Sequence, residues 1–293
     1  MKDINLFQEN KIKRLLAESL PIDINNIHYV KRIIGGMSNK TYLFSCGKEE
    51  YSVHISDKLG DDFVSRDAER EAFHILSLSG IVPEAVYLNE KDNRYRIFKY
   101  IPGSALDKLD YKKYYFEIAE SFHILHSAKL LSKNYEPFVK IYDLKDKVKE
   151  EKDPLFFEVF SLLENRKKDL ENRPLYFCHN DSQPSNLILG DNNKVYVIDF
   201  EFAGNNDYLY DIATFGNLDF TDSINMLKIY KEDASEEEYE YLKLWRLFIN
   251  LQWYLVALIK HETGFDERLK INFKDVAEFF LKSCIPIFEE IKK

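Results

Sequence analysis

The residues with the clearest chemical potential are polar side chains beside two short apolar runs. Asp181 and Asn186 precede the apolar triplet Leu187–Leu189, and Asp199 follows the run Val195–Ile198. A turn rich in Gly, Asp and Asn separates the two runs. Short apolar runs bounded by turn residues are typical of buried strands. The pattern predicts a hairpin with two polar residues before it and a carboxylate directly after it.

These residue types suit the transfer of a phosphoryl group. A carboxylate can orient or accept the proton of an attacking hydroxyl, while an amide oxygen and a second carboxylate can hold Mg²⁺ against nucleotide phosphates. His179, Asp181 and Asn186 have the spacing H-x-D-x-x-x-x-N of a kinase catalytic loop. Asp199-Phe200 occupies the place of the later metal-binding Asp-Phe. The alternative is a polar turn before a buried hairpin, but the whole constellation favours catalysis by Asp181, Asn186 and Asp199, with ATP and Mg²⁺ as cofactors.

Several features separate this sequence from protein kinases. Asn180 stands where they have Arg, Glu201 stands where they have the Gly after Asp-Phe, and no A-P-E triplet follows. The motifs HNDSQPSN and VIDFEFAG instead resemble the choline/ethanolamine kinase branch of the aminoglycoside-phosphotransferase-like kinases, including the LicA-type bacterial choline kinases. The resemblance extends from the glycine-rich stretch at Gly35 to Trp253.

The resemblance implies an α+β, bilobal protein-kinase-like fold. Residues 1–99 would form a small lobe with an antiparallel sheet and one main helix. Residues 100–103, with Pro102 and Gly103, would form the hinge, and residues 104–293 a larger, mostly helical lobe. Periodicity agrees with this layout. It predicts strands at 27–34, 41–46, 51–55, 85–88, 95–99 and 175–178, and helices at 6–20, 63–78, 114–130, 238–262 and 273–291, with two more between 141 and 170.

The glycine-rich stretch lies between two predicted strands. Backbone amides of such a loop can cover phosphates, although most such runs are ordinary hairpins. Its position upstream of the catalytic pattern, and its similarity to the family's GGMTN-type loop, favour a nucleotide flap. The nucleotide-binding residues predicted there are Gly36, Met37, Ser38, Asn39, Lys40 and Thr41.

His54 is a departure from the family pattern. The family has a Lys or Arg here that grips the nucleotide phosphates, and a Glu on the next helix, matched by Glu69, that pairs with it. A neutral imidazole can donate a hydrogen bond but lacks a permanent charge. His54 is therefore either a functional substitute engaged by Glu69 or a polar residue on a strand face. The resemblance also places the backbone of Lys99 and Ile101 against the adenine.

The resemblance implies an aromatic cage for a cationic acceptor, held by cation–π attraction. The predicted acceptor-binding residues are Asp181, Glu201, Phe202, Tyr210 and Trp253. Each aromatic residue has core packing as its alternative role. Trp253 matches the first Trp of the family's W-x-x-W motif, while Val256 replaces the second. The resemblance further implies that Asp211 braces the catalytic loop.

The composition of the chain indicates which classes of binding partner and which cellular location to expect. A net charge of −9 argues against a nucleic-acid partner and suits a cationic small substrate. The three cysteines lie far apart without metal-ligand spacing, which predicts reduced thiols in a cytoplasmic protein. The N-terminal residues lack the apolar core of a signal peptide, and we predict no membrane insertion. Oligomeric state is not predicted.

The function expected from these features is that of an ATP-dependent small-molecule kinase. It would transfer the γ-phosphate to the hydroxyl of choline or a related amino alcohol. Alternative acceptors are ethanolamine, thiamine, an aminoglycoside or a methylthio-sugar. A nucleotide-binding pseudokinase is the alternative from another class, and it is motivated by His54.

Overall fold

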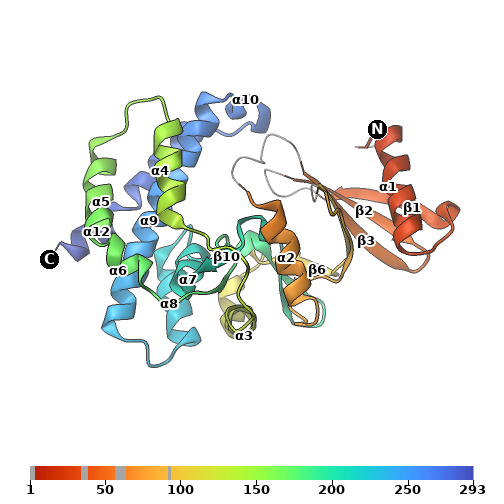
Figure 1. The fold of residues 1–293 in the computed structure, drawn as a ribbon, viewed down its shortest axis with the longest axis horizontal. Coiled ribbons are helices and arrows are strands. Elements are labelled where there is room, and N and C mark those ends of the chain that lie inside the picture. Colours follow the sequence, from red (N-terminus) through yellow and green to blue (C-terminus); the bar gives the residue numbers. More distant parts are fainter. Residues whose placement is uncertain (1–3, 34–38, 57–63, 92–93, 293) are drawn as a thin grey trace. The chain divides into compact units, whose positions relative to one another are not determined.

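The computed structural model describes residues 4–33, 39–56, 64–91 and 94–292, without the side chain of Asn39. The chain forms two compact units, which are described separately. Unit 1 consists of Met1–Lys133 with Pro184–Gly204, and unit 2 consists of Asn134–Gln183 with Asn205–Lys293. Figure 1 traces both along the sequence.

Unit 1 contains a five-stranded antiparallel sheet with the strand order β1-β2-β3-β5-β4. The strands are β1 (Ile27–Ile33), β2 (Asn39–Cys46), β3 (Glu49–Ser56), β4 (Ala85–Leu88) and β5 (Tyr95–Lys99). Helix α1 (Leu6–Ser19) packs against one face, and Figure 1 shows it beside β1. Phe44, Val53 and Ile97 of the sheet are fully buried together with Ile12 of the helix. All five strands and α1 lie where the sequence predicts them.

Helix α2 (Arg66–Leu76) contacts strand β5 of this sheet. It begins after Ser65, whose side chain accepts a hydrogen bond from the backbone N–H of Ala68. Phe73 packs on Phe98 of β5, with 4.5 Å between ring centroids. Apolar residues of the helix are buried on this side together with one carboxylate, Glu69. The buried side of the helix therefore carries a charged group as well as apolar residues.

A second sheet of unit 1 holds the predicted hairpin. Its order is β6-β8-β9, with β6 (Gly103–Ala105), β8 (Leu187–Gly190) and β9 (Val195–Val197). Strand β6 was not predicted, and its pairing needs Gly103, because a Cβ there would lie 2.2 Å from the carbonyl oxygen of Leu189. Helix α3 (Tyr115–His126) joins this sheet through Ser121, whose hydroxyl donates to the carbonyl of Val195 at 2.8 Å.

These contacts explain why unit 1 differs from the predicted lobes. Unit 1 continues past the predicted hinge at 100–103 and includes the hairpin because β6 and α3 both bind it. The predicted lobe boundaries at 99 and 104 remain a prediction, because a compact unit defined by contacts need not coincide with a kinase lobe.

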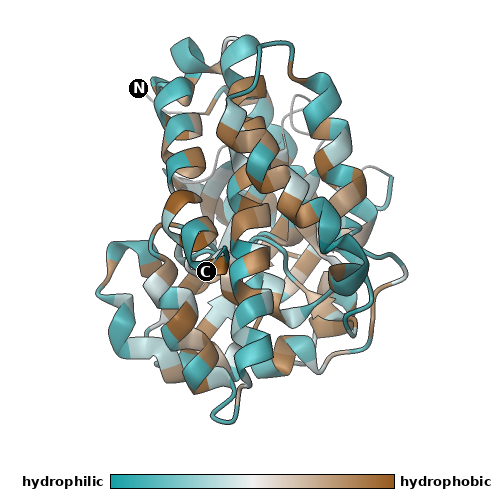
Figure 2. Cartoon of the chain, turned by 90° about the vertical axis from the view of Figure 1, so that its left-hand side faces the viewer, coloured by the Kyte–Doolittle hydropathy of each residue, from teal (hydrophilic) through white to brown (hydrophobic). Residues whose placement is uncertain are grey.

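Unit 2 is mostly helical, with a two-stranded sheet of β7 (Tyr176–Cys178) and β10 (Gly204–Asn206). Its helices are α4 (Pro137–Lys147), α5 (Pro154–Asn165), α6 (Lys167–Glu171), α7 (Tyr208–Phe215), α8 (Phe220–Tyr230), α9 (Glu236–Glu262), α10 (Phe265–Leu269), α11 (Phe273–Lys282) and α12 (Ile285–Ile291). Figure 2 shows apolar and polar residues together on these helices. Such amphipathic helices bury one side and expose the other.

Helix α9 is the core of unit 2. By length and composition alone this helix could cross a membrane, which was not predicted from the sequence. However, 83% of its most apolar 18-residue stretch is buried. Helices α4, α5, α7 and α11 contact it. Ser235 and Glu238 form a capping box at its start, which satisfies backbone N–H groups of the first turn. Burial inside unit 2 therefore accounts for its apolar composition.

The predicted helix at 273–291 is wrong as a single element. Helix α11 ends at Lys282, and α12 begins at Ile285 with Pro286 in its first turn. Proline lacks a backbone N–H and disfavours helix at the preceding residue, so the helix is interrupted there. Helices α8 and α10 were not predicted.

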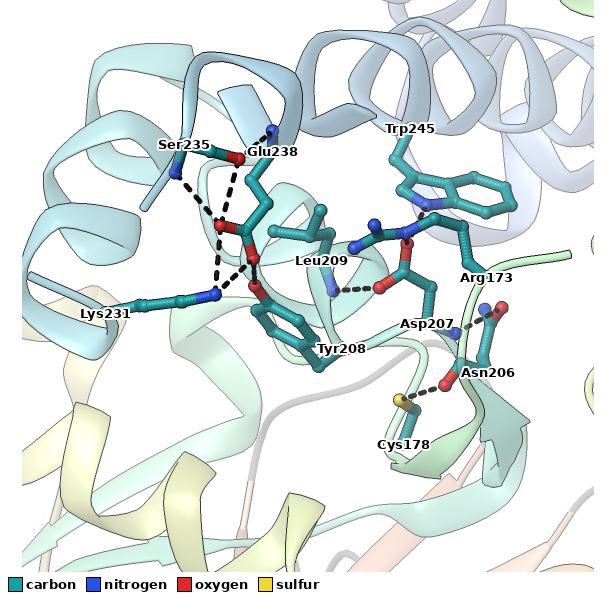
Figure 3. Close-up of polar contacts among 10 residues, drawn as sticks. All are labelled: Arg173, Cys178, Asn206, Asp207, Tyr208, Leu209, Lys231, Ser235, Glu238 and Trp245. Atoms are coloured by element: carbon teal, nitrogen blue, oxygen red, sulfur yellow. Dashed lines mark hydrogen bonds and ion pairs between the residues drawn. The ribbon is translucent and has the colours of Figure 1, made fainter. Parts of the chain in front are cut away.

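A buried carboxylate ties α7 to α9 (Figure 3). Asp207 accepts hydrogen bonds from the indole N–H of Trp245 at 2.8 Å and from Nε of Arg173 at 2.9 Å. It also caps α7 through the backbone N–H of Leu209. Because a buried carboxylate is costly unless it is paired, this network holds the start of α7 in one position.

Candidate active site

The H-x-D segment of the catalytic pattern lies in unit 2 and is held by Asp211. The two carboxylate oxygens of Asp211 accept hydrogen bonds from the backbone N–H groups of His179 at 2.8 Å and Asn180 at 2.6 Å. Its carbonyl accepts a third from the Ser182 hydroxyl at 2.6 Å. Asp211 is fully buried on α7. The structure thus confirms the predicted bracing by Asp211.

Asp181 lies in the middle of this braced segment. Its backbone N–H donates to Nδ1 of His179 at 3.2 Å, and the side-chain amide of Gln183 donates to its carboxylate at 3.3 Å. Asn180 has a φ of 63°, a left-handed conformation that asparagine tolerates better than most residues. Fixed backbone on both sides restricts where the Asp181 carboxylate can point.

The two predicted metal ligands lie in unit 1, at one end of the β8–β9 hairpin. Asn186 ends a short turn (Pro184–Asn186) before β8, and its carbonyl accepts from the N–H of Ile198 at 3.0 Å. Asp199 follows directly and has a φ of 65°, which is strained for a non-glycine residue. A carboxylate and an amide oxygen are ligands that Mg²⁺ prefers, so this pair fits the predicted metal.

A buried charge cluster surrounds Glu69 in unit 1. Its carboxylate lies 2.8 Å from Nη1 of Arg96 and 3.2 Å from Nη1 of Arg66, which also contacts Glu201 at 3.3 Å. Burial raises the pKa of Glu69, and the charge of Asp199 adds to this rise against the opposing charge of Arg96. Engagement of His54 by Glu69 was one of two open interpretations of His54, and the structure pairs Glu69 with these two arginines.

His54 contacts polar strand neighbours instead. Its Nδ1 lies 3.4 Å from the hydroxyl of Thr41 and its Nε2 lies 3.4 Å from that of Ser52. Its ring packs edge-on against Phe98. Burial, reinforced by the positive charge of Arg96, lowers the pKa of His54 to about 3. The imidazole is therefore neutral at physiological pH.

The predicted nucleotide flap and hinge are described in part. Gly36, Met37 and Ser38 lie outside the described residues, whereas Asn39–Thr41 begin β2. At the hinge, the N–H of Lys99 donates to the carbonyl of Glu84 at 2.9 Å, and its exposed ammonium pairs with Glu49. Ile101 follows two residues later. Their roles in nucleotide binding remain predictions.

The predicted acceptor residues are distributed over both units. Glu201 and Phe202 lie in unit 1, in the turn Phe200–Phe202. In unit 2, the ring of Tyr210 packs on Trp245, whereas Trp253 stacks on Phe280 with 6.2 Å between centroids. Within the described part of the chain, no ring contact joins Tyr210 to Trp253. A cage made of both is therefore not seen within unit 2.

Tyr135 is a neighbour of this site that the sequence did not reveal. Its ring lies 5.4 Å from that of Tyr210, and Gln252 bridges the two hydroxyls, donating to Tyr135 at 3.2 Å and accepting from Tyr210 at 3.1 Å. Burial raises the pKa of Tyr135 to about 12, and the charge of Asp181 adds to the rise. In the sequence, Tyr135 stands two residues before Pro137 and belongs to no motif that would indicate a binding role.

Comparison with known proteins identifies the family of this chain. The model of the phosphotransferase enzyme family matches residues 30–245, well over half of the chain. The chain belongs to this phosphotransferase family. A similar curated protein is Protein LicA of Haemophilus influenzae, 24% identical over 287 residues, covering 88% of this chain and 79% of the relative.

Two solved structures share the fold. One is choline kinase LicA from Streptococcus pneumoniae, with a TM-score of 0.78, 22% identity and coverage of 97% of this chain and 99% of the other. The other is an ethanolamine kinase from Plasmodium vivax, with a TM-score of 0.77, 18% identity and coverage of 98% and 92%. These likenesses confirm the predicted α+β, kinase-like fold class.

Weakening the hydrogen bonds that Asp211 accepts from the H-x-D segment should lower the free energy of unfolding. We expect Asp211→Asn to destabilise the protein by about 1–3 kcal/mol, because one of two buried N–H groups would face an amide donor. Chemical denaturation followed by circular dichroism measures the change. Asp153→Asn is the control, since Asp153 caps the exposed start of α5 and Asn caps equally well. A loss as small as that of the control would contradict the bracing role.

Proposed function

We propose that this phosphotransferase is an ATP- and Mg²⁺-dependent kinase that phosphorylates the hydroxyl of choline or a closely related amino alcohol. The observation that carries the proposal is the H-x-D segment braced by Asp211, followed by Asn186 and Asp199 at one end of a hairpin. Phosphoryl transfer depends mainly on positioning and charge neutralisation, to which the braced segment of unit 2 and the hairpin end of unit 1 would each contribute.

Each residue has a defined role in this proposal. The Asp181 carboxylate orients the acceptor hydroxyl and accepts its proton, and its backbone is fixed by His179. Asn186 and Asp199 would hold the metal, which when bound neutralises charge on the phosphates. The backbone around Lys99 and Ile101 would meet the adenine, and residues 36–41 would cover the phosphates. Glu69 belongs to the same nucleotide-binding part of unit 1.

A cationic acceptor is supported by charge and by aromatic residues near the base. The chain carries a net charge of −9. In unit 2, Asp181 acts electrostatically on both Tyr135 and Tyr210. Aromatic faces and carboxylates together favour ammonium groups over neutral alcohols. The similar choline kinase and ethanolamine kinase structures support the same class of acceptor.

Ethanolamine is the second candidate, and one residue favours it. Val256 stands where the second tryptophan of the family's motif is expected. A smaller side chain gives less aromatic surface for a trimethylammonium group, whereas a primary ammonium relies more on hydrogen bonds.

Trp253 tests whether the tail motif contributes to acceptor binding. We expect Trp253→Leu to raise KM for the acceptor by about 2- to 30-fold, the scale of one cation–π contact of roughly 0.5–2 kcal/mol, with little change in KM for ATP. Steady-state kinetics with each substrate varied measures the difference. Phe279→Leu is the control, because Phe279 is an exposed aromatic residue on the neighbouring helix α11. Equal changes in both KM values would assign Trp253 to packing alone.

A cytoplasmic location is proposed from the state of the cysteines. Cys46, Cys178 and Cys284 are buried free thiols, which suits a reducing cytoplasm. We propose no nucleic-acid partner and no membrane insertion.

One assay separates the candidate acceptors. ADP release from ATP and Mg²⁺ is followed with choline, ethanolamine, thiamine, an aminoglycoside and a methylthio-sugar, each over a range of concentrations. We expect the highest kcat/KM with choline or ethanolamine. A preference for an aminoglycoside would replace the acceptor, and ADP release that no alcohol stimulates would contradict the kinase proposal.

A further inference from the structure

A cross-strand row in unit 1 places a buried arginine beside the position that lacks the family's basic residue. Thr41, His54 and Arg96 are direct partners across β2, β3 and β5. Directly opposed residues of antiparallel strands point to the same face, with Cβ atoms about 4.5–5.5 Å apart. Arg96 therefore extends from the same face as His54, one strand further along. Thr41 joins this row at the end of the predicted nucleotide flap.

Arg96 also forms the ion pair that kinases make with their strand lysine. Its Nη1 lies 2.8 Å from the Glu69 carboxylate, and neither side chain is more than 2% exposed. In protein kinases a glutamate of the main small-lobe helix pairs with a lysine of the third strand, and that lysine contacts the nucleotide phosphates. In this chain the helix glutamate is present, but its strand partner comes from β5 instead of β3.

Two other nitrogen-bearing side chains, His54 and Arg66, lie nearby. His54 is neutral at physiological pH, as described above. Arg66 contacts Glu201 as well as Glu69, so two carboxylates share its charge. A guanidinium stays protonated and has donors along more than one edge, so one arginine can bind a carboxylate and a phosphate together. Arg96 has both the position and the permanent charge.

We propose that Arg96 is the phosphate-binding cation of this kinase, held by Glu69 and acting from β5 in place of the basic residue that β3 lacks. The inference rests on the proposed function, because it requires ATP as the phosphoryl donor. It assigns His54 no direct part in charge neutralisation.

Direct nucleotide binding tests the proposal without need of an acceptor. The dissociation constants of ATP with Mg²⁺ and of adenosine are measured by calorimetry for wild type, Arg96→Met, and Arg96→Met combined with His54→Lys. We expect Arg96→Met to weaken ATP binding by about 10- to 100-fold, the scale of a hydrogen bond to a charged group, and to leave adenosine binding unchanged. The added His54→Lys should restore most of the lost ATP affinity, because it returns a cation to β3.

Arg70→Met is the matched control. Arg70 is an arginine of the same helix as Glu69, paired with Asp67 on the surface, and its loss should leave both affinities unchanged. Equal losses for ATP and adenosine in Arg96→Met, or no rescue by His54→Lys, would overturn the proposal. Wild-type protein that bound no ATP would overturn the proposed function as well, whereas tight ATP binding that Arg96→Met leaves intact would overturn this inference alone.

A second variant guards against misfolding. Removing Arg96 takes one arginine away from the buried Glu69 carboxylate, which still pairs with Arg66, and the loss can destabilise the fold. Arg96→Met combined with Glu69→Gln removes both charges of the pair and should show the same selective loss of ATP affinity. Wild-type ATP affinity in this double variant would contradict the assignment of Arg96.

Discussion

Asp199→Ala is expected to abolish turnover, with a fall in kcat of about 10³-fold or more, because it removes the carboxylate proposed to hold the metal. The fold should survive. Asp199 lies at the end of the β8–β9 hairpin, outside the strand pairs that hold the hairpin together. Its left-handed backbone conformation is strained, and such strain is typical of residues kept for function rather than for stability. Initial rates of ADP release at saturating ATP and acceptor measure the effect.

The matched control for this change is Asp191→Ala. Asp191 lies in the exposed turn at the opposite end of the same hairpin, so the substitution removes an acidic residue without touching the proposed metal site. Wild-type turnover in Asp191→Ala together with an inactive, folded Asp199→Ala supports the assignment. Turnover by Asp199→Ala within a few-fold of wild type would mean that another group holds the metal.

Asp181→Asn should lower kcat by about 10²- to 10⁴-fold, the usual contribution of a positioned general base. The amide keeps the shape of the side chain and its contact with Gln183 but cannot accept the proton of the acceptor. Because Asp181 is not proposed to touch the nucleotide, the dissociation constant of ATP should stay near the wild-type value. Single-turnover kinetics and calorimetry separate the two effects.

Asp219→Asn serves as the control for this second change. Asp219 caps the exposed start of α8, where asparagine is an equally good cap, so its activity should match wild type. If Asp181→Asn retained most of its activity while binding ATP normally, the base would have to be another residue.

Much of the site followed from the sequence because its residues lie close together along the chain. The H-x-D segment, Asn186 and Asp199 lie within 21 positions and are fixed by local elements, a braced loop and a tight hairpin. Their positions in a loop and at the end of a hairpin could therefore be predicted from local spacing. The five strands of the first sheet were equally predictable, because each is a short stretch with apolar residues between turn signals, and β3 also shows alternation at Tyr51, Val53 and Ile55.

Contacts made across strands or between distant helices were not predictable. The pairing of Glu69 with Arg96 depends on β5 lying beside β3, and nothing in the spacing of these residues indicates that register. Tyr135 meets Tyr210 through tertiary packing alone. The break between α11 and α12 had a local signal in Pro286, which the apolar periodicity on both sides concealed.

We propose that this phosphotransferase transfers the terminal phosphoryl group of ATP to the hydroxyl of a small cationic alcohol. Phosphorus NMR of a reaction containing ATP, Mg²⁺ and the best acceptor of the panel follows this transfer itself. We expect a new phosphomonoester signal that grows in equal amount with ADP, and no such signal with Asp199→Ala. ADP that accumulates with inorganic phosphate alone, at a rate unchanged by the acceptor, would contradict it.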